Sequence, residues 1–283
     1  MKSFWQTSKR KLFFSEKTLV MAILNVTPDS FSDGGDFFSV DDALKQAEKF
    51  VAEGADILDI GGESTRPKSA RVSAEEEIRR VAPVIEQIAK RFDVPISIDT
   101  SKAEVAESAV NAGAEIINDI SGLRFDERVT EVAAKTNAGV VLMHSRGDFE
   151  TMHGQKPVEN ILREVSRGFR ISLEKAKVYG VKTENIALDV GIGFGKTFEQ
   201  NLELIARLAE LCEEFSEFPM LVGTSRKSFI GKILDDVPTS ARLRGSLASA
   251  AIAVWNGAKI VRVHDVEATV EAIKVVGAIK KQL

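Results

Sequence analysis

The chain has 283 residues, 44% of them hydrophobic and 28% charged, which is enough to bury one sizeable core in a single domain. Its 42 acidic and 38 basic residues leave a net charge of -4, so no overall positive field would attract nucleic acid or an anionic membrane. We expect neither as a partner, and the balance favours a small-molecule ligand.

The N-terminal segment raises the question of a targeting signal. Basic residues at positions 9–11 precede Leu12, Phe13 and Phe14, but this apolar run is too short for a signal peptide and Ser15, Glu16 and Lys17 interrupt it. No later run is long enough to span a membrane, so we predict a cytoplasmic location.

The chain carries a single cysteine, Cys212, which cannot form an internal disulfide. Its neighbours Leu211, Glu213 and Glu214 suggest one face of a helix, and we interpret Cys212 as a structural thiol.

Short β-branched and apolar runs alternate with longer segments of helical periodicity, a pattern typical of βαβ units and a parallel sheet. The predicted strands are Leu19 to Leu24, Ile57 to Ile60, Ile96 to Ile98, Ile116 to Ile117, Val140 to Met143, Ile186 to Leu188, Met220 to Val222 and Ile260 to Val263. The predicted helices include Val40 to Ala52, Ala74 to Ala89, Ala103 to Asn111, Val158 to Lys177, Leu202 to Glu214, Ala241 to Trp255 and Val266 to Ile279.

Eight such units predict an α/β fold of the (β/α)8 or TIM-barrel type, a single domain over residues 19–283 with residues 1–18 as an N-terminal extension. The alternative is an open doubly wound sheet, which would use fewer strands and usually place a glycine-rich phosphate turn after the first one. Asn25-Val26-Thr27-Pro28 stands there instead, and no Pro-, Gly- or Ser-rich linker divides the chain.

Polar residues lie at the end of every predicted strand, where barrel enzymes carry their chemistry. One such residue alone is more often a helix cap or a satisfied structural group, but all eight ends together indicate a site. The residues are Asn25, Asp59, Asp99, Asn118 with Asp119, His144, Asp189, Ser225-Arg226-Lys227, and Arg262 with His264.

Arg262 and His264 are two residues apart, so in a strand both side chains point to the same face. The guanidinium suits phosphate oxygens, and the histidine can be charged or neutral according to what binds. The alternative is that Arg262 is tied to a neighbouring carboxylate for structural reasons.

Asp99, Asn118 and Asp189 come from three different strands and offer two carboxylates and one amide to the barrel mouth. A 2-amino-4-oxo-pyrimidine ring presents adjacent N–H donors that a carboxylate accepts in pairs, while an asparagine serves a mixed donor and acceptor edge. A metal cluster of carboxylates is the competing interpretation.

Two loops have the composition of a lid over the mouth, Thr27 to Gly35 and Gly61 to Pro67. A third, Gly191 to Thr197, superficially looks like a nucleotide-binding loop, but its spacing fits neither the P-loop nor the dinucleotide pattern. We therefore exclude ATP and NAD as ligands.

Several motifs together resemble the dihydropteroate synthase family over roughly Val20 to Asp265. They are Ile23-Leu24-Asn25-Val26-Thr27-Pro28-Asp29-Ser30-Phe31-Ser32-Asp33-Gly34-Gly35, Asp59-Ile60-Gly61-Gly62-Glu63-Ser64-Thr65-Arg66-Pro67, Ser97-Ile98-Asp99-Thr100, Ile117-Asn118-Asp119-Ile120, Ser225-Arg226-Lys227-Ser228 and Arg262-Val263-His264-Asp265.

The resemblance implies that 4-aminobenzoate displaces pyrophosphate from 6-hydroxymethyl-7,8-dihydropterin diphosphate, by a dissociative path without a covalent enzyme intermediate. It implies Mg²⁺ as cofactor, with Asn25 as its protein ligand, and a homodimer. The implied catalytic residues are Asp99, Lys227, Arg262 and His264. The implied binding residues are Asp99, Asn118, Asp189, Lys227 and Met143 for the pterin, Asn25, Arg66, Arg262 and His264 for the diphosphate, and Thr65, Pro67, Phe194, Lys227 and Ser228 for the aminobenzoate.

Two loops depart from the usual family text. After the sixth strand, Val190 and Ile192 stand where the family commonly has a proline and a phenylalanine, which puts loop stiffness and the fit of sulfonamide analogues in question. After the fifth strand, Ser145 and Arg146 replace the commoner methionine and glutamine between His144 and Gly147. We assign no role to His144.

Three rival functions stay open. A barrel methyltransferase that uses methyltetrahydrofolate shares the carboxylate and amide template but needs no grip on a diphosphate, a silent paralogue would bind pterin without reaction, and a phosphosugar barrel fits the fold alone. The segment Gly245 to Ile252 could form a dimer interface or pack on the barrel, and we favour packing for its buried half.

Overall fold

A closed barrel of eight parallel strands forms the centre of the computed structural model, which describes residues 3–15, 17–27, 40–65, 69–152 and 154–282. The strands pair in the order β10-β3-β4-β5-β6-β7-β8-β9, so each neighbours the next in sequence and the last returns to the first. The predicted (β/α)8 fold is confirmed. The strands are β3 (Leu19–Asn25), β4 (Ile57–Gly61), β5 (Ile96–Asp99), β6 (Ile116–Asp119), β7 (Gly139–Met143), β8 (Ile186–Asp189), β9 (Met220–Val222) and β10 (Ile260–Val263).

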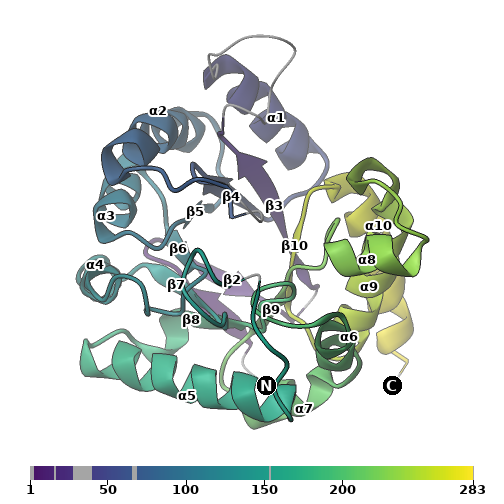
Figure 1. The fold of residues 1–283 in the computed structure, drawn as a ribbon. Helices are drawn as coiled ribbons and strands as arrows, with labels where there is room; N and C mark the ends of the chain where they lie inside the picture. The colour runs from purple at the N-terminus through teal and green to yellow at the C-terminus, as the bar shows by residue number, and fades with distance from the viewer. Residues whose placement is uncertain (1–2, 16, 28–39, 66–68, 153, 283) are drawn as a thin grey trace.

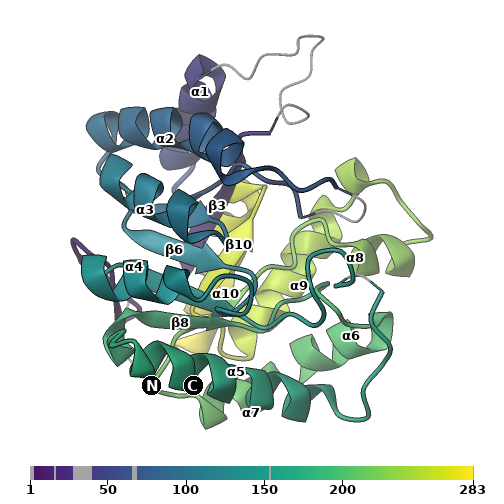
Figure 2. The same cartoon turned by 60° about the vertical axis from the view of Figure 1, so that its left-hand side comes forward.

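Helices follow the strands and form a ring around the barrel (Figure 1). In a second view, α2, α3 and α4 stack along one side (Figure 2). Within the ranges given above, no helix is long and apolar enough to cross a membrane. The helices are α1 (Val40–Ala52), α2 (Ala74–Arg91), α3 (Ala103–Ala112), α4 (Arg128–Thr136), α5 (Ile161–Val178), α6 (Phe198–Ala206), α7 (Leu208–Glu214), α8 (Ser228–Ile233), α9 (Leu243–Trp255) and α10 (Val266–Lys280).

The prediction of one helix from Leu202 to Glu214 was wrong, because the structure has two helices there. Arg207 ends α6 and begins α7 with φ -106° and ψ 21°, outside the α-helical range. The sequence also gave no sign of α4 and α8. The first buries only Val129, Thr130 and Ala133, and the second has only six residues, so neither produces a long hydrophobic period.

The inward-facing side chains of the strands change from apolar to polar along the barrel axis. Near the strand starts, Ile57, Ile116, Ala187 and Ile260 belong to one buried apolar cluster. Two residues further along each of these strands, on the same face, stand the polar residues of the mouth, which are Asp59, Asn118, Asp189 and Arg262. Strand parity alone therefore aims these four side chains at one place.

The N-terminal extension forms a hairpin of β1 (Phe4–Gln6) and β2 (Lys11–Phe13) against the apolar end of the barrel. Trp5 is fully buried in that cluster, and its indole Nε1 donates to the carbonyl oxygen of Asn185 at 2.7 Å. The extension therefore packs onto the barrel and closes the end opposite the polar mouth.

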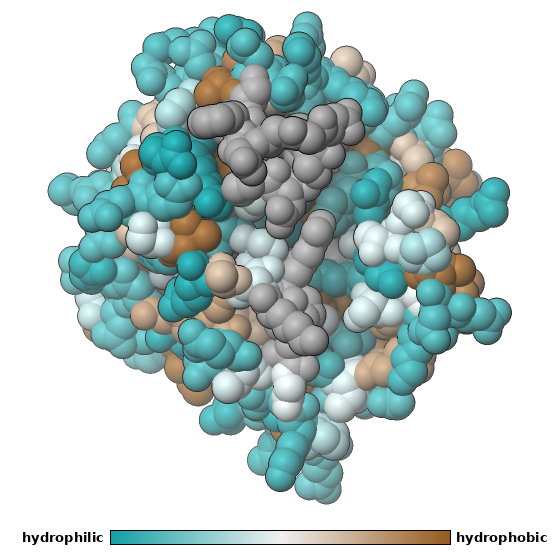
Figure 3. Space-filling model, turned by 45° about the horizontal axis from the view of Figure 1, so that its top comes forward, coloured by the Kyte–Doolittle hydropathy of each residue, from teal (hydrophilic) through white to brown (hydrophobic). Residues whose placement is uncertain are grey.

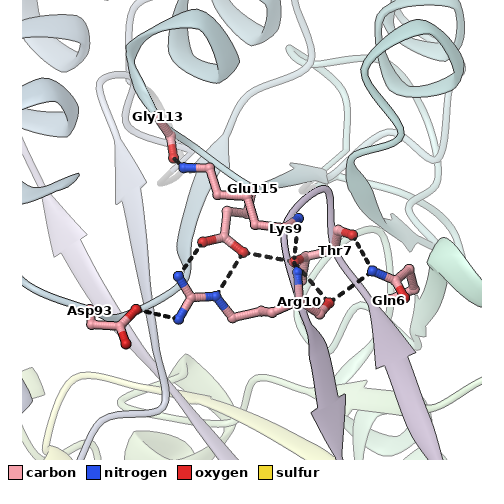
Figure 4. Close-up of polar contacts among 7 residues, drawn as sticks. All are labelled: Gln6, Thr7, Lys9, Arg10, Asp93, Gly113 and Glu115. Atoms are coloured by element: carbon pink, nitrogen blue, oxygen red, sulfur yellow. Dashed lines mark hydrogen bonds and ion pairs between the residues drawn. The ribbon is translucent and has the colours of Figure 1, made fainter.

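Polar contacts hold the hairpin turn in place (Figure 4). The buried carboxylate of Glu115, just before β6, accepts from Thr7 Oγ1 at 2.7 Å and pairs with Arg10 Nη2 at 2.9 Å. Arg10 also donates to Asp93 at 2.6 Å. A carboxylate this deeply buried is stable as an ion only with such partners.

The surroundings of Cys212 fit the structural interpretation. Burial raises the pKa of its thiol to about 11, and the space beside Sγ is so tight that a side chain at Gly257 would begin 3.0 Å away. The thiol is therefore protonated at neutral pH, whereas the thiolate is the nucleophilic form.

We predict that Trp5→Ala lowers the free energy of unfolding by about 3–5 kcal/mol, because it opens a cavity in the closed end of the barrel. Urea denaturation measures this. Phe13→Ala is the matched control, since its side chain on β2 is 58% exposed and its loss should cost about 1 kcal/mol or less. Equal losses in both variants would contradict the role given to Trp5.

Candidate active site

Arg262 on β10 lies at the centre of the polar mouth. Its Nε donates to Asp59 Oδ2 and its Nη2 to Asp99 Oδ2, each at 2.6 Å. Burial acts to lower the pKa of Arg262, but the two carboxylates outweigh it and the pKa is raised. The side chain is 20% exposed and a guanidinium has five N–H groups, so donors remain for a ligand beyond the two carboxylates.

Asp99 on β5 is the more accessible of these two carboxylates. Its pKa is raised to about 7, chiefly by burial and also by the negative charge of Asp59, while Arg262 acts in the opposite direction. Asp99 can therefore change protonation state near neutral pH, which is common among groups that work in active sites.

Asp59 on β4 organises two of its neighbours. Its Oδ2 accepts from Arg262 and, at 3.2 Å, from Asn118 Nδ2, while the side chain is fully buried. Asp59 lies at a predicted strand end, but the sequence pattern assigns it no specific role. One feature of the sequence could have indicated this organising role. A carboxylate at an inward-facing barrel position is buried, and a buried charge needs hydrogen-bonding partners.

Asp189 and Lys227 lie on the opposite side of the mouth, on β8 and after β9. Asp189 Oδ1 accepts from the backbone N–H of Gly191 at 2.8 Å, and burial raises the pKa of its carboxyl. Lys227 Nζ lies 4.2 Å from the centroid of the Phe194 ring, and burial lowers its pKa to about 8. Phe194 and Met143 belong to one apolar cluster.

His264 follows β10 and contacts Ser225. Its Nδ1 lies 3.0 Å from Ser225 Oγ, and its backbone N–H donates to the same oxygen at 3.2 Å. Burial, and then the charges of Arg226 and Arg262, lower the pKa of His264 to about 3. His264 is therefore neutral, and Arg262 supplies the positive charge of the pair.

The remaining residues predicted from sequence lie in different places. A Cβ built at Gly61 would lie 3.6 Å from both Asn25 Oδ1 and Asp99 Cβ, which places Asn25 at the mouth. Asp119 instead accepts from the backbone N–H groups of Ser121 and Leu123 and shapes the turn after β6. Thr65 lies in the loop after β4, Ser228 opens α8, and Arg66 and Pro67 fall outside the described residues.

The chain is similar in sequence to proteins of known function. A family model described as "Pterin binding enzyme" covers residues 21–264. The chain is 51% identical to the dihydropteroate synthase of Escherichia coli over 259 residues, covering 92% of this chain and 90% of the relative. It belongs to the dihydropteroate synthase family.

Solved structures of the family superpose closely. A Yersinia pestis dihydropteroate synthase in complex with a sulfonamide drug has a TM-score of 0.92 at 45% identity, covering 98% of this chain and 99% of that one. A Xanthomonas albilineans dihydropteroate synthase with 4-aminobenzoic acid has a TM-score of 0.91 at 40% identity, covering 99% of both. As a member of this family the chain is a transferase of folate biosynthesis.

The loop after β8 is anchored by the two residues that differ from the usual family text. Val190 and Ile192 are both buried in the main hydrophobic core, so packing fixes the loop where the family commonly uses a proline and an aromatic ring. Gly191 between them has φ +66°, and any side chain there would collide with the carbonyl oxygen of His144. The loop is therefore held by its core side chains and by a glycine that permits the turn.

A buried charge network fixes the segment that follows the family's second motif. Lys102 Nζ donates to Glu63 Oε1 at 3.0 Å, to Glu77 Oε2 at 2.6 Å and to the carbonyl oxygen of Val72 at 2.8 Å. Burial raises the pKa of Glu77 although Lys102 opposes it. One ammonium thus connects the loop after β4 with α2 and the start of α3.

We predict that Lys102→Met lowers the free energy of unfolding by about 3 kcal/mol or more, because it leaves two buried carboxylates without their cation. Urea denaturation tests this against Lys135→Met, whose 80%-exposed side chain should cost within about 0.5 kcal/mol. Adding Glu77→Gln to Lys102→Met should recover part of the loss. An unchanged midpoint for Lys102→Met would show that the network contributes no net stability.

Proposed function

We propose that the barrel mouth joins 6-hydroxymethyl-7,8-dihydropterin diphosphate to 4-aminobenzoate by a dissociative substitution. The observation that supports this most is the position of Arg262, which the carboxylates of Asp59 and Asp99 hold at the mouth before any substrate is present. Preorganised charge is effective in catalysis because it needs no reorganisation as the leaving group departs.

The pterin ring would lie among Asn118 and Asp189, which strand parity aims at the mouth, and Asp99, which contacts Arg262 there. Two carboxylates accept the amino and ring N–H groups, and the amide of Asn118, oriented by Asp59, completes a mixed edge. Met143 and Lys227 would cover the faces of the pterin ring. Met143 belongs to the same apolar cluster as Phe194, and Lys227 lies over the Phe194 ring.

The diphosphate would lie against Arg262 and His264. Ser225 Oγ accepts the backbone N–H of His264, and when its hydroxyl donates to Nδ1 the imidazole proton resides on Nε2. Neutral His264 then donates one hydrogen bond, and Arg262 supplies the charge. Arg66 is a further candidate from the family motif.

The residues present fit a magnesium ion at Asn25. Asn25 offers one neutral amide oxygen at the mouth, and Mg²⁺ characteristically takes few protein ligands and completes its shell with substrate phosphates and water. Among the described residues no group of three His, Cys, Asp or Glu side chains could hold a metal, so a carboxylate cluster is not a competing arrangement there. When bound, magnesium would neutralise charge on the diphosphate.

In the reaction itself, the bond between the pterin methylene carbon and the diphosphate oxygen breaks first, and its electron pair leaves with the diphosphate. Arg262 and His264 stabilise the departing negative charge, while ionised Asp99 faces the positive charge that spreads onto the dihydropterin ring. The amine of 4-aminobenzoate then bonds to the methylene carbon and releases a proton to solvent. No side chain becomes covalently attached.

The aminobenzoate would lie at the outer part of the mouth, between Phe194 and the start of α8. Lys227 and Ser228 present a cation and a hydroxyl to its carboxylate, and Thr65 and Pro67 would complete the enclosure. The weakly basic arylamine needs no dedicated general base, because its attack follows departure of the leaving group.

We predict that the purified chain releases pyrophosphate with formation of dihydropteroate, and that Arg262→Gln and Asp99→Asn each lower kcat/KM by about 100-fold or more. A coupled pyrophosphate assay with chromatography of the pteroate measures this. Arg163→Gln, an exposed change on α5, is the control and should not differ from the unmodified chain. Pterin binding without product would contradict the synthase proposal and favour the silent paralogue or the methyltransferase.

We predict that affinity for a pterin ligand falls as pH decreases through about 7. Asp99 must be ionised to accept two N–H groups, and its raised pKa means that protonation begins near neutrality, so affinity is lost below pH 7 and level above it. Calorimetry between pH 5.5 and 8.5 tests this, with titration of the free ligand as control. In Asp99→Asn binding should be weaker and flat with pH. Affinity that rises on acidification would contradict the role of Asp99.

The homodimer implied by the family would use the paired helices α9 and α10. Ile252 on α9 is 50% exposed and Val275 on α10 is 61% exposed. Figure 3 shows apolar residues in several separate groups, some of them on the right-hand side, where Figure 1 has α8, α9 and α10. Ile252→Glu with Val275→Glu should convert a dimer into a monomer in sedimentation velocity, whereas Val178→Glu on α5 should not. A monomeric unmodified chain would overturn the assignment.

A further inference from the structure

A second cavity lies outside the barrel mouth, between the turns after β6 and β7 and the helix α5. Its volume is about 300 Å³, roughly the share of ten water molecules in the liquid. Arg124, Arg146 and Arg167 line it together with the imidazole of His144 and the hydroxyl of Ser145. Glu164 is the one carboxylate among the described lining residues, and it pairs with Arg167 at 3.0 Å.

Hydrogen bonds fix the arginines at the cavity without using all their donors. Arg124 donates to Ser145 Oγ at 2.7 Å and to the carbonyl oxygen of Gly147 at 2.9 Å, and it also bonds the preceding turn. Arg146 donates through Nη1 to the carbonyl oxygen of Gly195 at 2.9 Å. Each guanidinium has five N–H groups, so both retain donors for a ligand.

The imidazole of His144 is buried at this cavity with polar capacity unused. The side chain is 6% exposed, and its Nδ1 has no hydrogen-bond partner among the described residues. Gly168 makes room for the ring in the middle of α5, because any side chain there would collide with Cδ2 of His144. A glycine in the middle of a helix lowers its stability by about 1 kcal/mol relative to alanine. Helix α5 is therefore destabilised at the point where it accommodates the His144 ring.

The electrostatics of the cavity are positive. Burial, followed by the charges of Lys196, Arg124, Arg146 and Arg167, lowers the pKa of His144 well below its ordinary value. The imidazole is therefore neutral. Three arginines and one glutamate give the lining a net charge of about +2, which would balance the charge of a phosphate dianion.

The lining includes Ser145 and Arg146, two of the four positions at which this chain departs from the usual family text. Where a methionine is commoner, Ser145 leaves space and accepts the hydrogen bond that orients Arg124, and Arg146 adds a second guanidinium. Ser145 and Arg146 thus supply two of the polar groups that line the cavity.

We propose that this cavity, which adjoins the barrel mouth at Met143, binds a phosphate dianion presented by a small phosphomonoester, at a site distinct from Arg262 and His264. Planar guanidinium groups match phosphate oxygens in pairs, and Ser145 and His144 add a hydroxyl and a neutral imidazole to the lining residues. The volume accommodates more than a bare ion, which favours an ester over inorganic phosphate. The site does not depend on the synthase chemistry of the mouth.

Calorimetry with two probes, inorganic phosphate and glycerol 3-phosphate, tests the proposal. Because the mouth also attracts phosphate, the unmodified chain should bind two equivalents and Arg262→Gln only one. Adding Arg146→Gln and Arg167→Gln to Arg262→Gln should weaken the remaining site about tenfold to a hundredfold, since each charge-assisted bond contributes that order. Glycerol 3-phosphate should bind there more tightly than inorganic phosphate.

The matched control, Arg163→Gln with Lys177→Gln, removes the same charge from exposed positions of α5 outside the cavity. It should leave binding unchanged. Arg167→Glu alone changes a 66%-exposed side chain, so it tests the site without disturbing the core. Arg163→Glu is its control. A single equivalent bound to the unmodified chain, or equal losses in cavity and control variants, would overturn the proposal. Tighter binding of inorganic phosphate would overturn the ester assignment.

Discussion

The buried guanidinium of Arg262, shared between Asp59 and Asp99, is the interaction on which the rest of the mouth depends. It joins β10 to β4 and β5 across the barrel, because both carboxylates lie on inward-facing positions. Charges in such a place are expensive unless they are paired, and breaking a buried pair costs far more than its net contribution suggests. The same contacts orient Asn118 through Asp59. Burial raises the pKa of Asp99 to about 7 against the opposing charge of Arg262, so the shape and the charge of the site are set in the same place.

The barrel makes this arrangement possible by separating stability from chemistry along its axis. Apolar inward residues and the N-terminal hairpin, with Trp5 at its centre, fill one end. Polar residues two positions further along the same strands then occupy the other end, on a rigid support. Around the mouth, core side chains such as Val190 and Ile192 and the ammonium of Lys102 hold the loops. The positioning of Arg262 therefore rests on groups that never touch a ligand.

Much of this was predictable from sequence, and what was missed has physical causes. Strand positions followed from apolar runs, and strand-end polarity with parity identified Arg262, His264, Asp99, Asn118 and Asp189. The hairpin was not foreseen, because two three-residue strands give almost no periodic signal and their stability comes from distant partners such as Glu115. The orienting role of Asp59 needs a contact across 203 positions of sequence, which no local pattern reports. Arg66 and Pro67 lie outside the described residues, so their roles stay predictions.

The most direct test of the central claim is the affinity for pyrophosphate, measured by calorimetry in the unmodified chain, Asp59→Asn, Arg262→Gln and the double variant. Asp59→Asn removes a negative charge beside the site, so simple attraction would make pyrophosphate bind more tightly. If Asp59 acts by positioning Arg262, binding weakens about tenfold when Arg262 is present and changes little when it is absent. Tighter binding in Asp59→Asn, or the same weakening in both backgrounds, would contradict the account.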